Sequence, residues 1–407
     1  MAKRVLYIEG NTDGTVGGSY FLMLDLVNRL DRTQYEPIVG FHRDNYLIER
    51  FRAAGIEVIV FPRANPLNFG SKWLNVLLAP VKKAINIYRG LIGPARAHAR
   101  FLRERKIDLI NLNNSITRNH PWMLAAMLTN TPCITHEMGL NNSFSRTSRF
   151  FGRRLQRVIC LSHAIHNAMK KCGIDYPNIE VIHCGIDLGR YELRETPEML
   201  RKKHGIPPDS PVIGVVGNIR GWKGQETLVR ATAHLKRDYP NIRCLLVGDC
   251  GEADRTYGDK LHGLCKEFDI VDNVIFTGFQ RNAIDYMELM DVVTHTSIHP
   301  EPFGIVTLEA MSRCKPLVST TIGGPAEVVI NGETGLLVDP GKPELLANAV
   351  KTFLDDRARA AEMARRGFER LKSHFSMQQN IDKTMRVYAE VLGANAASRE
   401  HVQPQRA

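Results

Sequence analysis

The sequence predicts an α/β fold made of two doubly wound, Rossmann-like domains that face each other across a cleft. Short apolar runs rich in β-branched residues alternate with helical patterns, which favours parallel sheets covered by helices. The alternation restarts after a polar, proline-bearing stretch at 187–209, which indicates a linker and a second unit of similar size. A glycine-rich loop follows the first strand of each unit, at the place where such folds bring the backbone close to a ligand.

Each unit has its own set of predicted strands. Those of the first unit are 5–8, 37–41, 57–61, 108–112, 133–137 and 158–162. Those of the second unit are 211–217, 244–248, 274–278, 291–295 and 316–319. We therefore expect an N-terminal domain at 1–187, a C-terminal domain at 188–375, a helix at 376–393 and a disordered tail at 394–407.

The composition is that of a globular protein with an anionic partner. The 407 residues are 43% hydrophobic and 24% charged, and the formal net charge is +11. This charge favours an anionic substrate, an anionic membrane surface or nucleic acid. The eight cysteines include no Cys-x-x-Cys pair, so we expect reduced thiols and a cytoplasmic protein. No apolar run is long enough to span a bilayer.

A basic and apolar segment at 72–106 does not fit a plain sheet-and-helix unit. It has nine Lys and Arg residues and a single acid, Glu104, interleaved with Trp, Leu, Val and Ile. Such a segment can lie in an anionic membrane interface. The alternative is a core helix with a solvated basic face.

The second glycine loop carries two cations. Arg220 and Lys223 follow a predicted strand and precede a predicted helix within Gly217–Gly224. Cations at such a place suit a diphosphate whose charge grows as it leaves. The alternative is a pair of ordinary surface cations.

The most specific pattern in the chain runs from Glu301 to Glu309. Glu301 stands between two prolines and cannot lie inside a helix. Gly304 permits a close backbone approach, and a helix beginning at Ile305 offers free N–H groups to a phosphate. Glu309 falls one turn into that helix, where its carboxylate can accept two ribose hydroxyls. The alternative is an ordinary loop entering a core helix.

With these motifs the chain resembles the retaining nucleotide-sugar glycosyltransferases of family 4, which have the GT-B fold. The resemblance rests mainly on the Glu-x7-Glu pattern with its Glu-Pro-Phe-Gly opening at Glu301. The stretches 181–187, 323–327 and 331–338 are also similar to family segments. Asn218 stands where the family usually has Arg.

The resemblance implies that 1–187 is the acceptor-side domain, that 188–375 is the nucleotide-sugar-binding domain, and that the helix at 376–393 crosses back to the first domain. It also implies a role for each of several residues. Glu301 would hold the donor sugar, Glu309 the ribose, and Arg220 with Lys223 the leaving diphosphate. His136 matches a family histidine near the donor sugar. The remaining implied donor-binding residues are Gly17, Gly18, Asn218, Gly278, Phe279, Phe303, Gly304, Ile305 and Val306.

The predicted function is a retaining glycosyltransferase that moves a sugar from a UDP- or GDP-sugar to an acceptor hydroxyl in cell-envelope polysaccharide or glycolipid synthesis. No cofactor or metal is expected, because there is no Asp-x-Asp triplet and prolines interrupt the spacing of His295, His299 and Glu301. The expected acceptor is a glycan or a lipid-linked sugar, and the protein would lie in the cytoplasm, peripherally on the inner face of the cell membrane. The alternatives are a nucleotide-sugar epimerase and a catalytically silent GT-B partner subunit. Nucleic-acid binding is disfavoured, because no aromatic residues for base stacking cluster with the cations.

Overall fold

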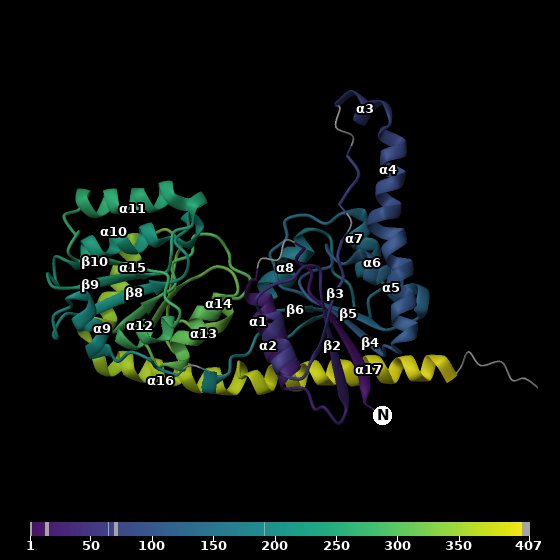
Figure 1. Ribbon diagram of the computed structural model, residues 1–407. Helices are drawn as coiled ribbons and strands as arrows, with labels where there is room; N and C mark the ends of the chain where they lie inside the picture. The colour runs from purple at the N-terminus through teal and green to yellow at the C-terminus, as the bar shows by residue number, and fades with distance from the viewer. Residues whose placement is uncertain (1, 13–15, 64, 69–71, 191, 401–407) are drawn as a thin grey trace, which may run out of the picture. The chain divides into compact units, whose positions relative to one another are not determined.

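The computed structural model describes residues 2–12, 16–63, 65–68, 72–190 and 192–400. The chain divides into two compact units, each with its own parallel sheet (Figure 1). The first unit comprises Met1–Ile182 together with Ile381–Ala407, and the second comprises His183–Asn380. This division precedes the boundary expected after residue 187.

The first unit is built on a seven-stranded parallel sheet of order β3-β2-β1-β4-β5-β6-β7. Its strands are β1 (Lys3–Ile8), β2 (Tyr35–Phe41), β3 (Glu57–Val60), β4 (Leu109–Leu112), β5 (Cys133–Glu137), β6 (Arg157–Cys160) and β7 (Ile179–Val181). The interior strand β1 pairs through Leu6 with Ile38 of β2 on one side and Ile110 of β4 on the other. All three side chains are fully buried, as expected for a parallel sheet covered on both faces.

Helices with clear sequence signals connect these strands. They are α1 (Gly18–Asn28), α2 (Ile48–Ala53), α5 (Gly93–Glu104), α6 (His120–Thr129), α7 (Arg146–Gly152) and α8 (His163–Lys171). The Ser162 hydroxyl accepts a hydrogen bond from the Ile165 N–H at 3.1 Å and so caps α8. The buried Trp122 of α6 stacks on His98 of α5 with ring centroids 3.8 Å apart, which joins these two helices.

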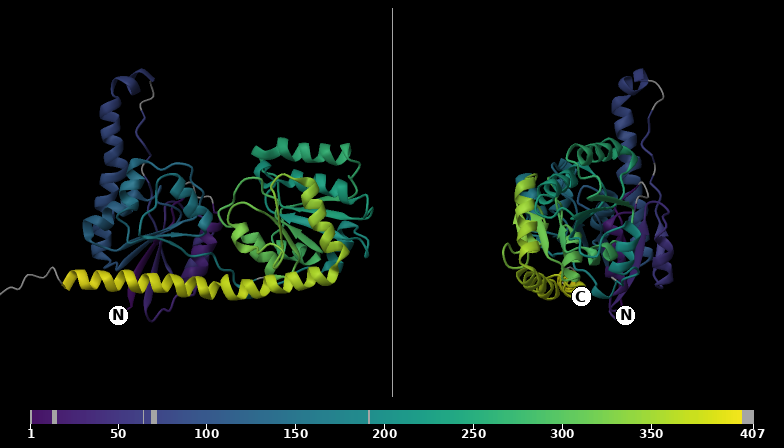
Figure 2. Two further views of the ribbon diagram at one scale, coloured as in Figure 1. Left: turned by 180° about the vertical axis from the view of Figure 1, so that it is seen from behind. Right: turned by 90° about the vertical axis from the view of Figure 1, so that its left-hand side faces the viewer.

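The basic segment at 72–106 is helical. It forms α3 (Lys72–Leu77), α4 (Ala79–Ile87), a π-helical turn (Tyr88–Ile92) and α5. Helices α3 and α4 project away from the sheet of their own unit in all three views (Figures 1 and 2). In the described part of α4 no side chain is buried, so this helix is not a core helix.

The second unit has a six-stranded parallel sheet of order β10-β9-β8-β11-β12-β13. Its strands are β8 (Val212–Val216), β9 (Arg243–Val247), β10 (Val274–Gly278), β11 (Val292–Thr294), β12 (Leu317–Thr320) and β13 (Leu336–Val338). Helices α10 (Gln225–Leu235), α11 (Arg255–Glu267) and α15 (Pro343–Asp355) form a layer on one face (Figure 1). The other helices of the unit are α9 (Pro197–His204), α12 (Ala283–Leu289), α13 (Ile305–Ser312), α14 (Pro325–Val328) and α16 (Arg357–His374).

The expectation of a plain linker at 187–209 was wrong. This stretch contains α9, whose first turn is capped by the Thr196 hydroxyl accepting from the Met199 N–H at 3.3 Å. Proline at the first helical position and the Thr cap start the helix, and Leu200 anchors it in the core. The edge strands β7 and β13 also went unpredicted, because three residues carry too little periodicity to be recognised.

The last helix, α17 (Met377–Glu400), packs on the first unit from Ile381 onward. The buried Tyr388 hydroxyl donates to Tyr7 at 3.0 Å and accepts from Asn111, both on the sheet of that unit. The tail predicted to be disordered from residue 394 is still helical through Glu400, because alanine-rich sequence propagates a helix well. Residues 401–407 lie outside the described part.

Two further expectations concern the whole described chain. No helix within the described ranges is long and apolar enough to cross a membrane. All eight cysteines are free thiols, and five of them are buried in the core.

Candidate functional site

The second unit holds a polar cluster that starts at the loop after β8. This strand ends at Val216, and a single 3-10 turn at Gly221–Lys223 leads to α10. Gly224 has φ +70°, and a Cβ there would lie 2.1 Å from the Thr296 carbonyl oxygen. Only glycine fits this close approach. The turn therefore holds Lys223 against the segment that follows β11.

That segment presents three buried polar residues, His295, Thr296 and Ser297, directly after the apolar strand β11. The Thr296 hydroxyl donates to the Lys223 carbonyl at 2.8 Å. The His295 Nδ1 atom is hydrogen-bonded to the Ser319 hydroxyl at the end of β12, at 3.1 Å. These contacts fix the two loops to each other and orient the His295 ring.

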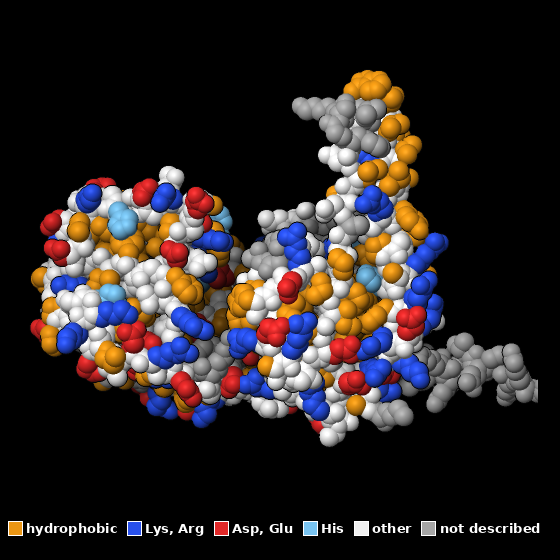
Figure 3. Space-filling model, in the orientation of Figure 1, with side chains coloured by type: hydrophobic (Ala, Val, Ile, Leu, Met, Phe, Trp, Pro, Cys, Tyr) orange, Lys and Arg blue, Asp and Glu red, His pale blue; other side chains and the backbone are white. Residues whose placement is uncertain are grey.

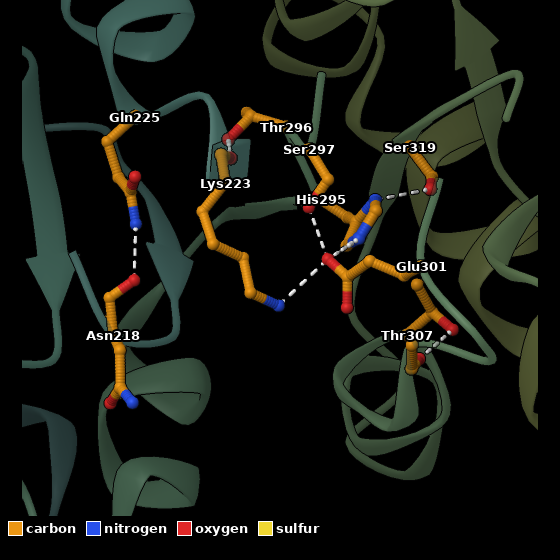
Figure 4. Close-up of polar contacts among 10 residues, drawn as sticks. Asn218, Lys223, Gln225, His295, Thr296, Ser297, Glu301, Thr307 and Ser319 are labelled. Atoms are coloured by element: carbon orange, nitrogen blue, oxygen red, sulfur yellow. Dashed lines mark hydrogen bonds and ion pairs between the residues drawn. The ribbon is translucent and has the colours of Figure 1, made fainter. Parts of the chain in front are cut away.

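Glu301 is the centre of the cluster (Figure 4). Its Oε1 atom lies 2.8 Å from Lys223 Nζ and 2.8 Å from His295 Nε2, and it also accepts from the Ser297 hydroxyl. A carboxylate only accepts, so His295 carries a proton on Nε2. Among the described residues all of these contacts go to Oε1, and none is found to Oε2.

Burial and charge act on Glu301 in opposite directions. Burial on its own raises the pKa of this carboxyl, but the hydrogen bond and charge of His295 and the charge of Lys223 outweigh it and lower the pKa to about 2. Glu301 is therefore ionised at neutral pH. It can accept hydrogen bonds but has no proton to give.

Helix α13 begins at Ile305, four positions after Glu301. Gly304 has φ +76°, and a Cβ there would lie 2.4 Å from the Pro325 ring. Its carbonyl accepts from both the N–H (2.9 Å) and the hydroxyl (2.7 Å) of Thr307, which closes the first turn. The eight residues of α13 carry half-buried Glu309 one turn in. The helix start and two carboxylates thus lie on one short segment.

The carboxyl ends of the first unit's strands also carry buried polar groups. Here backbone and side-chain amides donate hydrogen bonds to the buried carboxylate. Glu137, at the end of β5, accepts from the Ile116 N–H at 3.0 Å and from Asn141 Nδ2 at 2.6 Å. Burial raises its pKa to about 7. Burial also lowers the pKa of neighbouring His136 to about 4, so its imidazole is neutral at pH 7.

Two family descriptions match this chain, one in each half. Residues 45–190 match "Glycosyltransferase Family 4" and residues 197–370 match "Glycosyl transferases group 1". The chain belongs to the family 4 glycosyltransferases. Their GT-B fold accounts for the two Rossmann-like units.

Related proteins agree with this family 4 assignment. The solved structure of HepE from Anabaena in complex with UDP is 25% identical, covers 95% of this chain and 100% of its own, and has a TM-score of 0.78. A D-inositol 3-phosphate glycosyltransferase of Kineococcus radiotolerans is 32% identical over 56% of this chain and 55% of its own length. A lipopolysaccharide core biosynthesis mannosyltransferase of Rhizobium meliloti is 26% identical over 60% of this chain. The chain thus spans about half the length of the first of these curated relatives.

Several predicted site residues of the family 4 chain are brought together, and others are not. Lys223, Glu301 and Gly304 lie around the start of α13, but Arg220 pairs instead with Asp254, whose Oδ2 is 3.4 Å from its Nε. The Phe303 side chain is buried against His183 and Phe375, which leaves only its backbone for a ligand. Phe279 is 72% exposed beside Gly278.

The remaining predicted residues fall elsewhere or act through the main chain. The carbonyl of Asn218 accepts from Gln225 Nε2 at 3.0 Å. Ile305 and Val306 form the first turn of α13. Gly17, Gly18 and His136 belong to the first unit, and Gly17 precedes α1. Gly14 of the first glycine loop lies outside the described residues.

The sequence analysis missed His295 and Ser297 as partners of Glu301, and Ser319 as the partner of His295. It weighed His295 only as a zinc ligand, together with His299 and Glu301. His299 is exposed, and across the described ranges these three do not form a cluster of metal-ligating atoms. One sequence feature could have identified His295 as a site residue. It lies directly after an apolar strand, where polar side chains of an α/β fold contact ligands.

Proposed function

We propose that the chain is a retaining glycosyltransferase that uses a UDP- or GDP-sugar. The observation that carries this proposal is Glu301, an ionised carboxylate whose Oε1 is held by Lys223, His295 and Ser297 beside the start of α13. One fixed oxygen leaves the other to accept from a sugar hydroxyl. The helix start supplies N–H groups for a phosphate, and Glu309 one turn later supplies a carboxylate for a ribose.

In this reaction the bond between the sugar's anomeric carbon and the diphosphate oxygen breaks. A new bond forms from the acceptor hydroxyl oxygen to that carbon on the same face, and the hydroxyl proton passes to the leaving phosphate. Lys223 would turn from Glu301 to the phosphate and stabilise its growing charge, as would the α13 N–H groups. Because these positive groups come from the protein, we propose that no metal ion is required.

The relatives support this donor class. HepE was crystallised with UDP and, in another structure at 26% identity, with UDP and glucose. Relatives named for lipopolysaccharide core biosynthesis support an acceptor in the cell envelope. We propose a glycan or lipid-linked acceptor on this ground.

A donor screen tests the proposal. The protein is incubated with UDP-, GDP- and ADP-sugars, with and without EDTA, and nucleotide release and thermal shift are measured. One nucleotide at a hundred times its Kd should stabilise the fold by about 2.7 kcal/mol. A protein that no nucleotide stabilises would refute the donor site, and a converted sugar without acceptor would point to an epimerase.

We further propose that α3 and α4 bind an anionic membrane surface. Trp73 is 68% exposed and Val76 77% exposed, and Leu77 and Val81 are also exposed on this projection (Figure 3). The sequence has eight Lys and Arg residues and no acid from 58 to 103. An apolar tip inside a wholly basic segment suits the headgroup region of an acidic bilayer, with about 1 kcal/mol from each cation near the surface.

Vesicle co-sedimentation tests the membrane proposal. Binding should require anionic lipid, fall with salt, and weaken when Trp73 and Val76 are both changed to Ser or when Lys83 and Arg89 are both changed to Gln. Tyr46→Ser is the matched control, because Tyr46 is 69% exposed elsewhere in the same unit. Binding that is indifferent to lipid charge, or equally reduced by Tyr46→Ser, would count against the projection as a membrane contact.

A further inference from the structure

The first unit contains two arginines gathered around the loop that follows β1. Arg118 Nη1 donates to the Asn11 side-chain oxygen at 2.5 Å and to the Gly10 carbonyl at 3.4 Å. A Cβ added to Gly10 would lie 3.1 Å from Arg118 Cδ. The loop lies at the carboxyl ends of β1 and β4, where the strand order of the sheet reverses and where α/β folds bind ligands.

The second arginine, Arg63, is tied to the same loop through Asn119. Arg63 Nη2 donates to Asn119 Oδ1 at 3.0 Å, and His42 Nε2 lies 3.1 Å from the same oxygen. Because an arginine only donates, this contact fixes which side of the Asn119 amide is oxygen. The amide nitrogen of Asn119 must therefore point the other way.

That nitrogen, Asn119 Nδ2, has no hydrogen-bond partner among the described residues, although Asn119 is only 1% exposed. It lies 3.3 Å from the position of a Cβ on Gly10, so it faces the same loop as Arg118. A buried donor without an acceptor costs free energy and is rare in native proteins. This donor lacks the acceptor that a buried amide nitrogen needs.

The charges around the loop point to the same missing partner. Both arginines reach the surface, although the Arg63 guanidinium is partly buried, and the described residues include no carboxylate in an ion pair with either guanidinium. Burial, followed by the charge of Arg118, lowers the pKa of Arg63. Burial and the charge of Arg63 also lower the pKa of His42, so this ring is neutral at pH 7. Two like charges near an unpaired donor form a site that an anion would stabilise.

The site is also rigid. Asn114 Nδ2 donates to Glu9 Oε1 at 3.3 Å and to Asn11 Oδ1 at 3.2 Å, which holds the Asn11 side chain that accepts from Arg118. Asn114 has φ +75° and Asn119 has φ +59°. Non-glycine residues in this conformation are strained and concentrate at functional sites. The donors are thus held in place before any ligand arrives.

We propose that Arg63, Arg118 and the Asn119 amide bind a small anionic group, a phosphate monoester or a carboxylate, carried by the acceptor. The proposal rests on the proposed glycosyl transfer. It assigns the anion to the acceptor because Arg63, Arg118 and Asn119 belong to the first unit, whereas the side chains proposed above to hold the donor, Lys223, Glu301 and Glu309, belong to the second. A bidentate arginine contact and an amide donor suit the oxygens of either group.

The test uses the full chain saturated with UDP, so that the proposed diphosphate site is already occupied. Glucose 6-phosphate, glucuronate, inorganic phosphate and neutral glucose are titrated by calorimetry. We expect saturable binding of glucose 6-phosphate or glucuronate and none of glucose. Arg63→Gln, Arg118→Gln and Asn119→Asp should each weaken that binding about tenfold or more. Arg32→Gln is the matched control, because Arg32 is exposed in the turn that precedes β2.

Each outcome decides the question. Selective binding of glucose 6-phosphate identifies a phosphate site, and selective binding of glucuronate identifies a carboxylate site. The site is overturned if neither sugar binds, if Arg32→Gln weakens binding as much as Arg63→Gln, or if binding appears only without UDP. UDP binding measured on the same samples keeps the two proposals separate: an intact UDP response with no anion binding overturns this inference alone.

Discussion

Glu301 in the second unit and Glu137 in the first are both buried carboxyls at the carboxyl end of a parallel sheet, yet their pKa values move in opposite directions. Lys223 and His295 lower the pKa of Glu301 to about 2. Burial raises the pKa of Glu137 to about 7, because its hydrogen-bond donors, the Ile116 N–H, the Ser115 hydroxyl and the Asn141 amide, are neutral and the charge of Arg118 has the smallest effect. The comparison teaches that hydrogen bonds alone do not keep a buried carboxyl ionised here, whereas nearby cations do.

The largest expected effect comes from removing the charge of Glu301. If its carboxylate contacts the donor sugar, Glu301→Gln should lower the rate of sugar transfer roughly 10²- to 10³-fold, the usual cost of losing one fixed polar contact in a transition state. Nucleotide release with acceptor present measures this. Glu333→Gln, an exposed glutamate of the same unit, should leave the rate unchanged. A Glu301→Gln enzyme of ordinary rate would remove Glu301 from the chemistry.

Glu137 should make the fold less stable as pH rises. A carboxyl whose folded pKa is about 7 rather than the ordinary 4.5 keeps its proton in the folded state over that interval. Stability contributed by this group is therefore lost between pH 4.5 and pH 7, by about 2.5 kcal/mol from pH 5 to pH 8. Urea unfolding of the wild type and of Glu137→Gln at pH 5 and pH 8 measures the free energy of unfolding. The variant should lack this part of the decrease in stability with pH. If the free energy of unfolding changed equally with pH in both proteins, that result would contradict the raised pKa of Glu137.

Glu301 should act on stability in the opposite range. Its folded pKa of about 2 lies below the ordinary 4.5, so its contribution is present above pH 4.5 and is lost as pH falls toward 2. From pH 6 to pH 3 the loss should be about 2 kcal/mol. In Glu301→Gln this part of the acid destabilisation should vanish. Equal acid sensitivity in wild type and variant would show that the cations do not hold the carboxylate ionised.

The smallest effect sharpens the comparison within the first unit. Asn141→Ala removes the donor 2.6 Å from Glu137 Oε1, and one neutral hydrogen bond contributes about 1 kcal/mol. The pKa of Glu137 should rise further, and the stability lost with pH should move to higher pH. Carbon-13 NMR of the glutamate carboxyl measures the titration. A pKa that falls in Asn141→Ala would contradict the view that this amide favours the charged form.

Much of the fold followed from local sequence, because buried parallel strands are continuous apolar runs with polar ends. Eleven predicted strands match β1–β6 and β8–β12 within a residue or two at most ends. Helix α9 was missed because its polar surface looks like a linker, while its single core contact, Leu200, carries no periodic signal. The extent of α17 beyond residue 393 reflects the high helix propensity of its alanines.

The candidate site was predictable where a motif stands on one segment and not where distant segments meet. Glu301, Gly304 and Glu309 lie within nine residues of sequence, so their spacing indicated a ligand site. The contact of Glu301 with Lys223 spans 78 positions. The pairing of Arg220 with Asp254 likewise depends on how η4 (Glu252–Asp254) lies against the loop after β8. No sequence pattern in either segment alone predicts such contacts.

The backbone of the second unit's site has a consequence for how it can be mapped experimentally. A Cβ on Gly224 would overlap the Thr296 carbonyl, and one on Gly323 would lie 2.6 Å from the Glu301 nitrogen. Main chain, not side chain, therefore sets the spacing between the loops that carry Lys223 and Glu301. An alanine scan that truncates side chains and omits the glycines would not test these backbone contacts. Glycine-to-alanine changes are the complementary scan, and at these two positions they should disturb the site without removing any functional group.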